Sequence, residues 1–273
     1  MPFDGGYVGG SPGGGQVRGV RATQELWRSL NGCAPAVMVT PLAFAVQDGH
    51  YKDIQERIWA MSDAFNEELH DLADAGCPVI QMEEPQIHLL AARNYVDKVI
   101  NPEFMLKVFN NTVKGLRAKT EVWCHTCWGN PSQQRMFGSV QTYKPALKLL
   151  NQVDADVITF EMISSGAQDL EDVGREITDM KVAIGAIDHH TLQVESPAEI
   201  ADLVRKALKV IPPERLVLSS DCGMGREGMS RRHAFYKMVA LVQGTNIVKK
   251  ELGLPETESL GADPKMSLIR LNP

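Results

Sequence analysis

The stretch KVAIGAIDHHTLQVESPAEIADLVRKALKVIPPERLVLSSD, residues 181–221, contains an apolar run, a helical segment and a second apolar run. The helical segment begins with Ser196 as N-cap, Pro197 at the first helical position and Glu199 placed to complete a capping box. Apolar residues then recur on one face of the expected helix: Ile200, Leu203, Val204, Ala207, Leu208 and Ile211. The stretch therefore predicts a strand, a covering helix and a second, parallel strand.

The same alternation continues toward the amino terminus. Helices are expected within residues 51–76, where Gly76 ends the pattern, and within residues 101–116, which open with Asn101 and Pro102. Short apolar runs, typical of buried parallel strands, lie at 36–40, 78–83, 120–125, 156–161, 181–188 and 215–221. The chain therefore contains about six βα units, the repeat found in a parallel barrel or in a doubly wound sheet.

Polar residues at the ends of these runs favour the barrel. In a (β/α)₈ barrel the carboxyl ends of all strands converge on one mouth, whereas a doubly wound sheet spreads them along an edge. Five successive runs end on groups that bind metals or move protons: Glu83 and Glu84, His125 and Cys127, Glu161, Asp188 and His190, and Asp221 and Cys222. We predict a TIM-type (β/α)₈ barrel, incomplete at its N-terminus, over residues 20–273, preceded by a flexible glycine-rich arm over residues 1–19.

Composition narrows the class of protein. The chain has 273 residues, a net charge of -6 and a sequence pI near 5.7, which argues against a nucleic-acid surface. The sequence shows no secretory signal, and no apolar run approaches the roughly 20 residues of a membrane helix. Five cysteines scattered through such a chain predict free thiols or metal ligands in a cytoplasmic protein.

Four of the strand-end residues form a plausible zinc constellation. Two thiolates, an imidazole and a carboxylate suit Zn²⁺ and are poor ligands for Mg²⁺ or Ca²⁺. They come from three separate runs, which is typical of a catalytic site with an exchangeable position. The expected ligands are His125, Cys127, Glu161 and Cys222, with Glu161 the one that leaves when substrate arrives.

Each of these residue types also has a purely structural interpretation. Free cysteine is among the most buried residue types, and a His-x-Cys pair alone is more often part of a packed core than of a metal site. Cys124 should face away from His125 and pack in the core, and Trp128 is expected to form a wall of the mouth. Cys33 and Cys77 are expected to precede strands, and His50, His70, His88 and His233 to lie at the surface.

Five short motifs together resemble the zinc-binding catalytic barrel of cobalamin-independent methionine synthase. They occur in order between about residues 35 and 250 and read VIQMEEPQ, HTC, VITFE, GAIDHH and SSDCGMG. The resemblance implies that the four residues named above hold Zn²⁺. It also implies that Glu83, in the acidic pair with Glu84, binds the amino group of a thiol substrate, and that His190, beside Asp188, transfers a proton.

The chain departs from this family at its beginning. Only the glycine-rich arm and the short helical segment ATQELWRSL precede the first run, where the family has two further strands. The segment from GNPSQQRMF to LLNQ is also longer than its family counterpart. These differences leave the acceptor thiol and the completeness of the barrel open.

The expected function is a zinc-dependent methyl transfer to the thiol of homocysteine. The donor is a methyltetrahydrofolate or a methylated corrinoid protein, and the oligomeric state, a homo-oligomer included, is open. Two alternatives remain. One is an epoxyalkane:coenzyme M transferase, in which Arg226, Arg231 and Arg232 bind a sulfonate or carboxylate, although a solvated basic helix start is the favoured explanation of these residues. The other is a barrel that binds zinc without catalysis.

Overall fold

The computed structural model describes residues 33–36, 49–92, 100–128, 142–224 and 228–268. Six strands form one parallel sheet in the order β1-β2-β3-β4-β5-β6. The strands are β1 Cys33–Ala36, β2 Val79–Glu83, β3 Glu121–His125, β4 Val157–Phe160, β5 Lys181–Gly185 and β6 Leu216–Ser219. The predicted boundary at residue 19 lies outside the described residues.

The strand order decides between the two candidate architectures. Each strand pairs with the next strand of the chain, so the sheet always grows in the same direction. A doubly wound sheet reverses its direction once, whereas a TIM-type barrel does not. The fold class predicted from the sequence is therefore confirmed, with β1 and β6 at the edges of the sheet that the described residues form.

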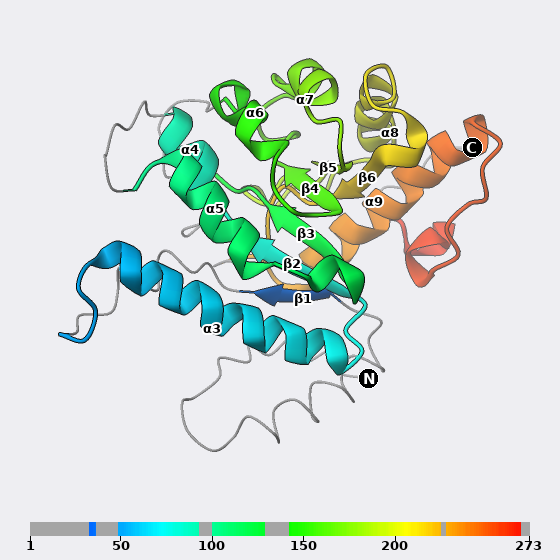
Figure 1. Cartoon of the computed structure of the whole chain (residues 1–273). Coiled ribbons are helices and arrows are strands. Elements are labelled where there is room, and N and C mark those ends of the chain that lie inside the picture. The colour runs from blue at the N-terminus through cyan, green and yellow to red at the C-terminus, as the bar shows by residue number, and fades with distance from the viewer. Residues whose placement is uncertain (1–32, 37–48, 93–99, 129–141, 225–227, 269–273) are drawn as a thin grey trace.

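The helices alternate with the strands and form an arc around them (Figure 1). Because parallel crossovers are right-handed, a sheet that grows in one direction receives its helices on one side. They are α3 Ile54–Asp74, α4 Gln86–Ala92, α5 Pro102–Thr112, α6 Leu147–Leu150, α7 Leu170–Glu176, α8 Pro197–Ala207 and α9 Arg231–Glu251. Short 3₁₀ turns occupy Leu116–Ala118, Lys144–Ala146, Pro213–Arg215, Leu260–Ala262 and Pro264–Met266.

The predicted helix ends are present. The side chain of Asn101 accepts a hydrogen bond from the Phe104 backbone N–H at 2.8 Å and caps α5. Ser196 and Glu199 form the complete capping box of α8. Gly76 has φ +91 just after α3, a left-handed conformation that glycine adopts without steric strain.

The first strand differs from its prediction. The apolar run at 36–40 led us to expect a strand there, with Cys33 before it. Instead Cys33 is the first residue of β1 and pairs in register with Val79, and residues 37–40 lie outside the described part. Backbone pairing with β2 sets this strand, and Pro35 is tolerated because β1 is an edge strand of the described sheet.

Alternate strand residues point to opposite sides of the sheet. One side packs with the helices in the hydrophobic core through Ile80, Met82, Val122, Cys124, Ile158, Phe160, Val182 and Ile184. Glu83, His125 and Thr159 are paired in register on the other side. Cys124 thus packs in the core as expected, and His125 is directed away from it.

Within the described residues no helix is both long and apolar enough to cross a lipid bilayer.

Candidate functional site

Three of the four predicted zinc ligands lie together at the carboxyl ends of the strands. His125 is the last residue of β3, Cys127 follows two residues later, and Cys222 lies just beyond β6. One ligand atom of each lies within 4.8 Å of those of the other two, and all three residues are buried. The sulfur atoms of the two cysteines are 3.2 Å apart, much longer than the roughly 2.05 Å of a disulfide. The parallel sheet thus brings residues from the ends of β3 and β6 together in a compact cluster of soft metal ligands.

The state of these side chains suits metal binding. Nδ1 of His125 is hydrogen-bonded to Oγ1 of Thr159 at 2.6 Å, while Nε2 is buried and has no hydrogen-bond partner among the described residues. The hydrogen bond with Cys127 lowers the pKa of Cys222, and His125 lowers it further, against the effect of burial. Burial lowers the pKa of His125, but Cys222 outweighs this effect and raises it. A thiolate and a deprotonated imidazole nitrogen are the forms that bind metal, so binding an ion here would release the His125 proton.

Glu161 lies beside this cluster. It follows β4, and its carboxylate accepts a hydrogen bond from the Trp128 backbone N–H at 2.9 Å. Its ligand atom falls in a second group with His189 and His190, all within 4.8 Å of one another. Burial raises the pKa of Glu161, which the Trp128 N–H partly offsets. The structure thus places the fourth predicted ligand between the soft-donor cluster and a histidine pair.

His190 is held by Asp188. Oδ1 of Asp188 accepts hydrogen bonds from the backbone N–H of His190 at 2.8 Å and from Nδ1 at 3.1 Å. Burial acts to raise the pKa of Asp188, but the hydrogen bonds from His190 outweigh it and hold the pKa below its usual value. Because an ionised carboxylate only accepts, Nδ1 carries a proton, and Nε2, which has no hydrogen-bond partner in the described structure, is the atom left for chemistry.

The acidic pair is split between two environments. Glu83 is half-buried and pairs in register with His125, on the side of the sheet that carries the cluster. Glu84 is buried, and its Oε1 accepts the Gln86 N–H at 2.9 Å at the start of α4. Burial raises the pKa of Glu84 to about 8. Burial also raises the pKa of Glu83, against the effect of His125. The two neighbouring carboxyls therefore differ in position.

Trp128 lies in an aromatic group behind the site. Its ring is buried, with centroid distances of 4.5 Å to His88 and 4.7 Å to Tyr143. The Tyr143 hydroxyl donates to the carbonyl of Thr126 at 3.3 Å and accepts from the Glu161 N–H at 3.2 Å. This group therefore contacts the backbone on both sides of the cluster, and Tyr143 was not singled out from the sequence.

The prediction that His88 lies at the surface is wrong. His88 is fully buried, and its Nε2 donates a hydrogen bond to the Cys127 carbonyl at 3.0 Å. Burial lowers the pKa of His88 to about 3, so the ring is neutral at ordinary pH. The sequence predicts a solvent-facing helix here, but α4 begins three residues after the end of β2, and its His88 contacts the backbone just after β3.

His189 was also missed. It is fully buried and belongs to both the group with Glu161 and His190 and a group with Asp188 and Asp221. The double histidine in DHH was the available signal. The two-residue alternation of a strand could not show which ring faces the site, because β5 ends at Gly185.

Asp221 fixes the loop after β4. Its carboxylate accepts hydrogen bonds from the N–H groups of Met162 at 2.8 Å, Ile163 at 3.3 Å and Ser164 at 2.9 Å. A Cβ at Gly185 would lie 1.9 Å from Oδ1 of Asp221, so only glycine leaves room for this carboxylate. The residue before Cys222 thus ties the β6 loop to the loop that carries Glu161.

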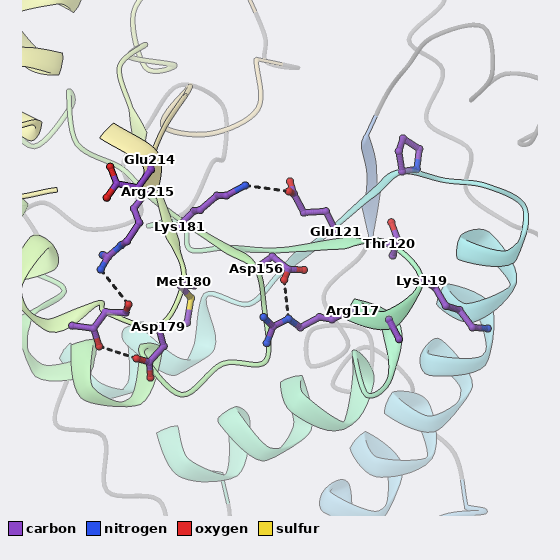
Figure 2. Close-up of a pocket in the computed structure, with 13 residues that line it drawn as sticks. Arg117, Lys119, Thr120, Glu121, Asp156, Asp179, Met180, Lys181, Glu214 and Arg215 are labelled. Carbon is purple, nitrogen blue, oxygen red and sulfur yellow. Dashed lines mark hydrogen bonds and ion pairs between the residues drawn. The ribbon is translucent and has the colours of Figure 1, made fainter. Parts of the chain in front are cut away.

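A charged pocket of about 750 Å³ lies at the opposite, amino-terminal ends of the strands. Figure 2 shows Arg117 directed at Asp156 and Lys181 directed at Glu121, with nitrogen–oxygen distances of 2.9 and 3.6 Å. Since these charges already pair with each other, and this end of a barrel generally serves stability, the pocket is not our candidate site.

Three basic residues were considered for anion binding, and the structure describes two of them. Arg226 is outside the described residues. Arg231 and Arg232 are exposed in the first turn of α9, where the Arg232 guanidinium lies 5.8 Å from the centroid of the Tyr236 ring. Their geometry fits a solvated helix start.

Known proteins share this sequence pattern. Residues 37–244 match the family described as "Cobalamin-independent synthase, Catalytic domain". A methionine synthase of Saccharolobus solfataricus is 28% identical over 203 residues, which is 74% of this chain and 54% of the relative. A methionine synthase of Saccharolobus islandicus is 30% identical over the same shares. The chain thus spans about half the length of the curated relatives that it matches.

Solved structures support the same relationship. A B12-independent methionine synthase from Shewanella sp. W3-18-1, in complex with selenomethionine, superposes with a TM-score of 0.71 at 26% identity, covering 90% of this chain and 70% of that one. A methyltransferase from Methanosarcina mazei, at 12% identity and a TM-score of 0.54 over 84% of this chain and 63% of that one, shares the fold. The strand-end motifs, the strand order and the match over 37–244 show that the chain belongs to the cobalamin-independent methionine synthase family.

Proposed function

We propose that this protein is a zinc-dependent methyltransferase that methylates the thiol of homocysteine to give methionine. The observation that carries the proposal is the buried cluster of His125, Cys127 and Cys222 at the carboxyl ends of β3 and β6. The names of the relatives point the same way, but they belong to chains about twice as long. The activity of this chain is therefore a proposal of its own.

The residues fit a zinc ion. Two cysteine sulfurs and a buried imidazole nitrogen without a partner form a donor set that suits Zn²⁺. The ion would be held by His125, Cys127 and Cys222, with Glu161 as the adjacent fourth ligand and the first to be replaced. When bound, zinc supplies the deprotonation of an acceptor thiol, whose free pKa is about 8.5.

The remaining side chains of the site would bind the acceptor and deliver a proton. The Glu83 carboxylate, beside His125 in the sheet, would bind the amino group of the acceptor, while Glu84 anchors the start of α4 beneath it. Trp128 would form a wall. His190, whose Nδ1–H is held by Asp188, would donate from Nε2 to the leaving amine of a methyltetrahydrofolate. A methylated corrinoid protein is the alternative donor.

Because cysteine ligands must stay reduced to bind the metal, we place the reaction in the cytoplasm.

Zinc analysis combined with turnover assays tests this function. We expect about one zinc per chain in the wild type, and methyl transfer to homocysteine but not to coenzyme M. Cys222→Ser and His125→Ala should lose both zinc and turnover. Cys124→Ala is the matched control because Cys124 is buried in the core on the other side of β3, so it should keep both. Full zinc content in the first two variants would rule out the ligand set, and bound zinc without transfer to homocysteine would rule out the function.

A further inference from the structure

One buried lysine of α9 contacts both ends of the segment that carries the histidine pair. Lys237 is completely buried, and its Nζ donates hydrogen bonds to the carbonyl oxygens of Asp188 at 3.0 Å and Gln193 at 2.5 Å. It also forms an ion pair with Glu195, at 2.9 Å to Oε1 and 3.1 Å to Oε2. A single ammonium group therefore holds residues 188 to 195 at both ends.

The Glu195 carboxylate extends this contact to the proton donor. Its Oε1 also accepts the backbone N–H of Asp188 at 2.9 Å. Asp188 in turn accepts from the backbone and from Nδ1 of His190. Lys237 is thus linked to the His190 ring by successive hydrogen bonds: Lys237 to Glu195, the Asp188 N–H to Glu195, and His190 to the Asp188 carboxylate.

The location of this ion pair is informative. A buried charged pair replaces the hydration of two ions and is weak evidence for stability by itself. Here the polar contacts of the Lys237 ammonium are with three residues of the segment after β5, Asp188, Gln193 and Glu195. Since α9 follows the loop that carries Cys222, the same helix connects the proposed metal loop with the proposed proton-donor loop.

We propose that Lys237 and Glu195 are positioning residues that keep the Nδ1–H of His190 on Asp188 and its Nε2 directed at the reacting groups. This inference rests on the proposed function for its catalytic consequence, but the orientation itself can be measured without turnover. A misplacement of about 1 Å in a catalytic group reduces a rate by up to about 100-fold.

The test is the double variant Lys237→Met with Glu195→Gln, which removes both charges and so leaves no unpaired ion in the interior. We expect unchanged zinc content, a KM for the thiol within about twofold of the wild type, and a kcat lower by about 10- to 100-fold. In ¹⁵N spectra of the imidazole groups, the His190 signals, identified with His190→Asn, should change from a single Nδ1–H tautomer to a mixture of tautomers.

The matched control is an exposed ion pair between α8 and α9, Arg205 with Glu251, whose nitrogen–oxygen distance is 2.6 Å. Arg205→Met with Glu251→Gln should leave the kinetics and the His190 spectrum unchanged. A folded Lys237/Glu195 double variant with the wild-type His190 spectrum would overturn the inference. If the double variant does not fold, Glu195→Ala alone decides it, because alanine removes the acceptor from both Lys237 and the Asp188 N–H. An unshifted His190 spectrum in a folded Glu195→Ala variant would again overturn the inference. Failure of the wild type to turn over would reject the proposed function and leave the spectral result as the measure of this inference.

Discussion

At the scale of single residues, His190 is the group whose surroundings best match a proton donor. Its Nδ1 is bonded to Asp188, and its buried Nε2 has no partner in the described part of the chain. We expect His190→Asn to lower turnover by about 100-fold or more, the usual contribution of a general acid, while zinc content stays at the wild-type value. Steady-state kinetics and metal analysis check this. His233→Asn, in the first turn of α9, is the control and should change neither turnover nor zinc content. Wild-type turnover in His190→Asn would show that His190 is not the proton donor.

Glu84 offers a prediction about the dependence of stability on pH. Burial raises its pKa from 4.5 to about 8, so between these values the folded state holds a proton that the unfolded state has released. The free energy of unfolding must then fall as pH rises through this window, by up to about 1.4 kcal/mol per pH unit. Glu84→Gln, a neutral mimic of the protonated carboxyl that keeps the Gln86 contact, should lack this loss.

Urea unfolding of both proteins at pH 5.5 and pH 7.5 measures the difference. The exposed Glu67 provides the control, since Glu67→Gln should follow the wild type at both pH values. If Glu84→Gln loses as much stability as the wild type over this range, then Glu84 is ionised in the folded protein.

The placement of residues at the site was only partly predictable from the sequence. His125, Cys127 and Cys222 could be brought together because strand ends of one parallel sheet meet at one edge. The buried positions of Glu84, His88 and His189 were harder to predict, because these residues lie beyond the last residue of a strand. There the alternation of a strand no longer applies, and the course of a loop or a short helix decides where a side chain points.

At the scale of elements, the contact between α8 and α9 depends on Gly244. Alanine is usually more favourable than glycine inside a helix by about 1 kcal/mol. A Cβ at Gly244, however, would lie 2.6 Å from Cβ of Ile200 and 2.7 Å from the carbonyl oxygen of Pro197. We therefore expect Gly244→Ala to lower the free energy of unfolding by about 1–3 kcal/mol. Gly261→Ala is the control, because its nearest contact would be 3.5 Å, and it should be nearly neutral in urea unfolding. A stabilised Gly244→Ala would show that the two helices separate easily.

Local signals predicted the elements well where they were strong. The capping box of α8 and the Asn101 cap of α5 follow from side chains that satisfy the first backbone N–H groups of a helix. The first strand was displaced because the strongest apolar run does not coincide with the residues that pair with β2. Pairing between distant segments sets such a boundary, and a single sequence does not reveal it.

At the scale of the whole molecule, the order of chemical groups along the chain was the decisive signal for the fold. Five strand-end motifs far apart in sequence required an architecture that unites them, and the observed order β1 to β6 meets this requirement. The same order means that a metal bound by residues after β3, β4 and β6 connects loops that the chain itself keeps more than 30 residues apart.

Zinc should therefore stabilise the molecule as a unit and not only the loops of the site. The ligands are far apart in an unfolded chain, so the ion binds the folded state and adds about 4 kcal/mol when its concentration is 1,000 times its Kd. We expect a chelator to lower the Tm of the wild type by on the order of 10 °C. Cys222→Ser should unfold at the same temperature with or without the chelator, and Cys124→Ala should respond like the wild type. If the wild-type Tm is unchanged after zinc analysis shows complete removal, the ion does not join β3 and β6. The cluster of His125, Cys127 and Cys222 must then be held by the packing of the strands alone.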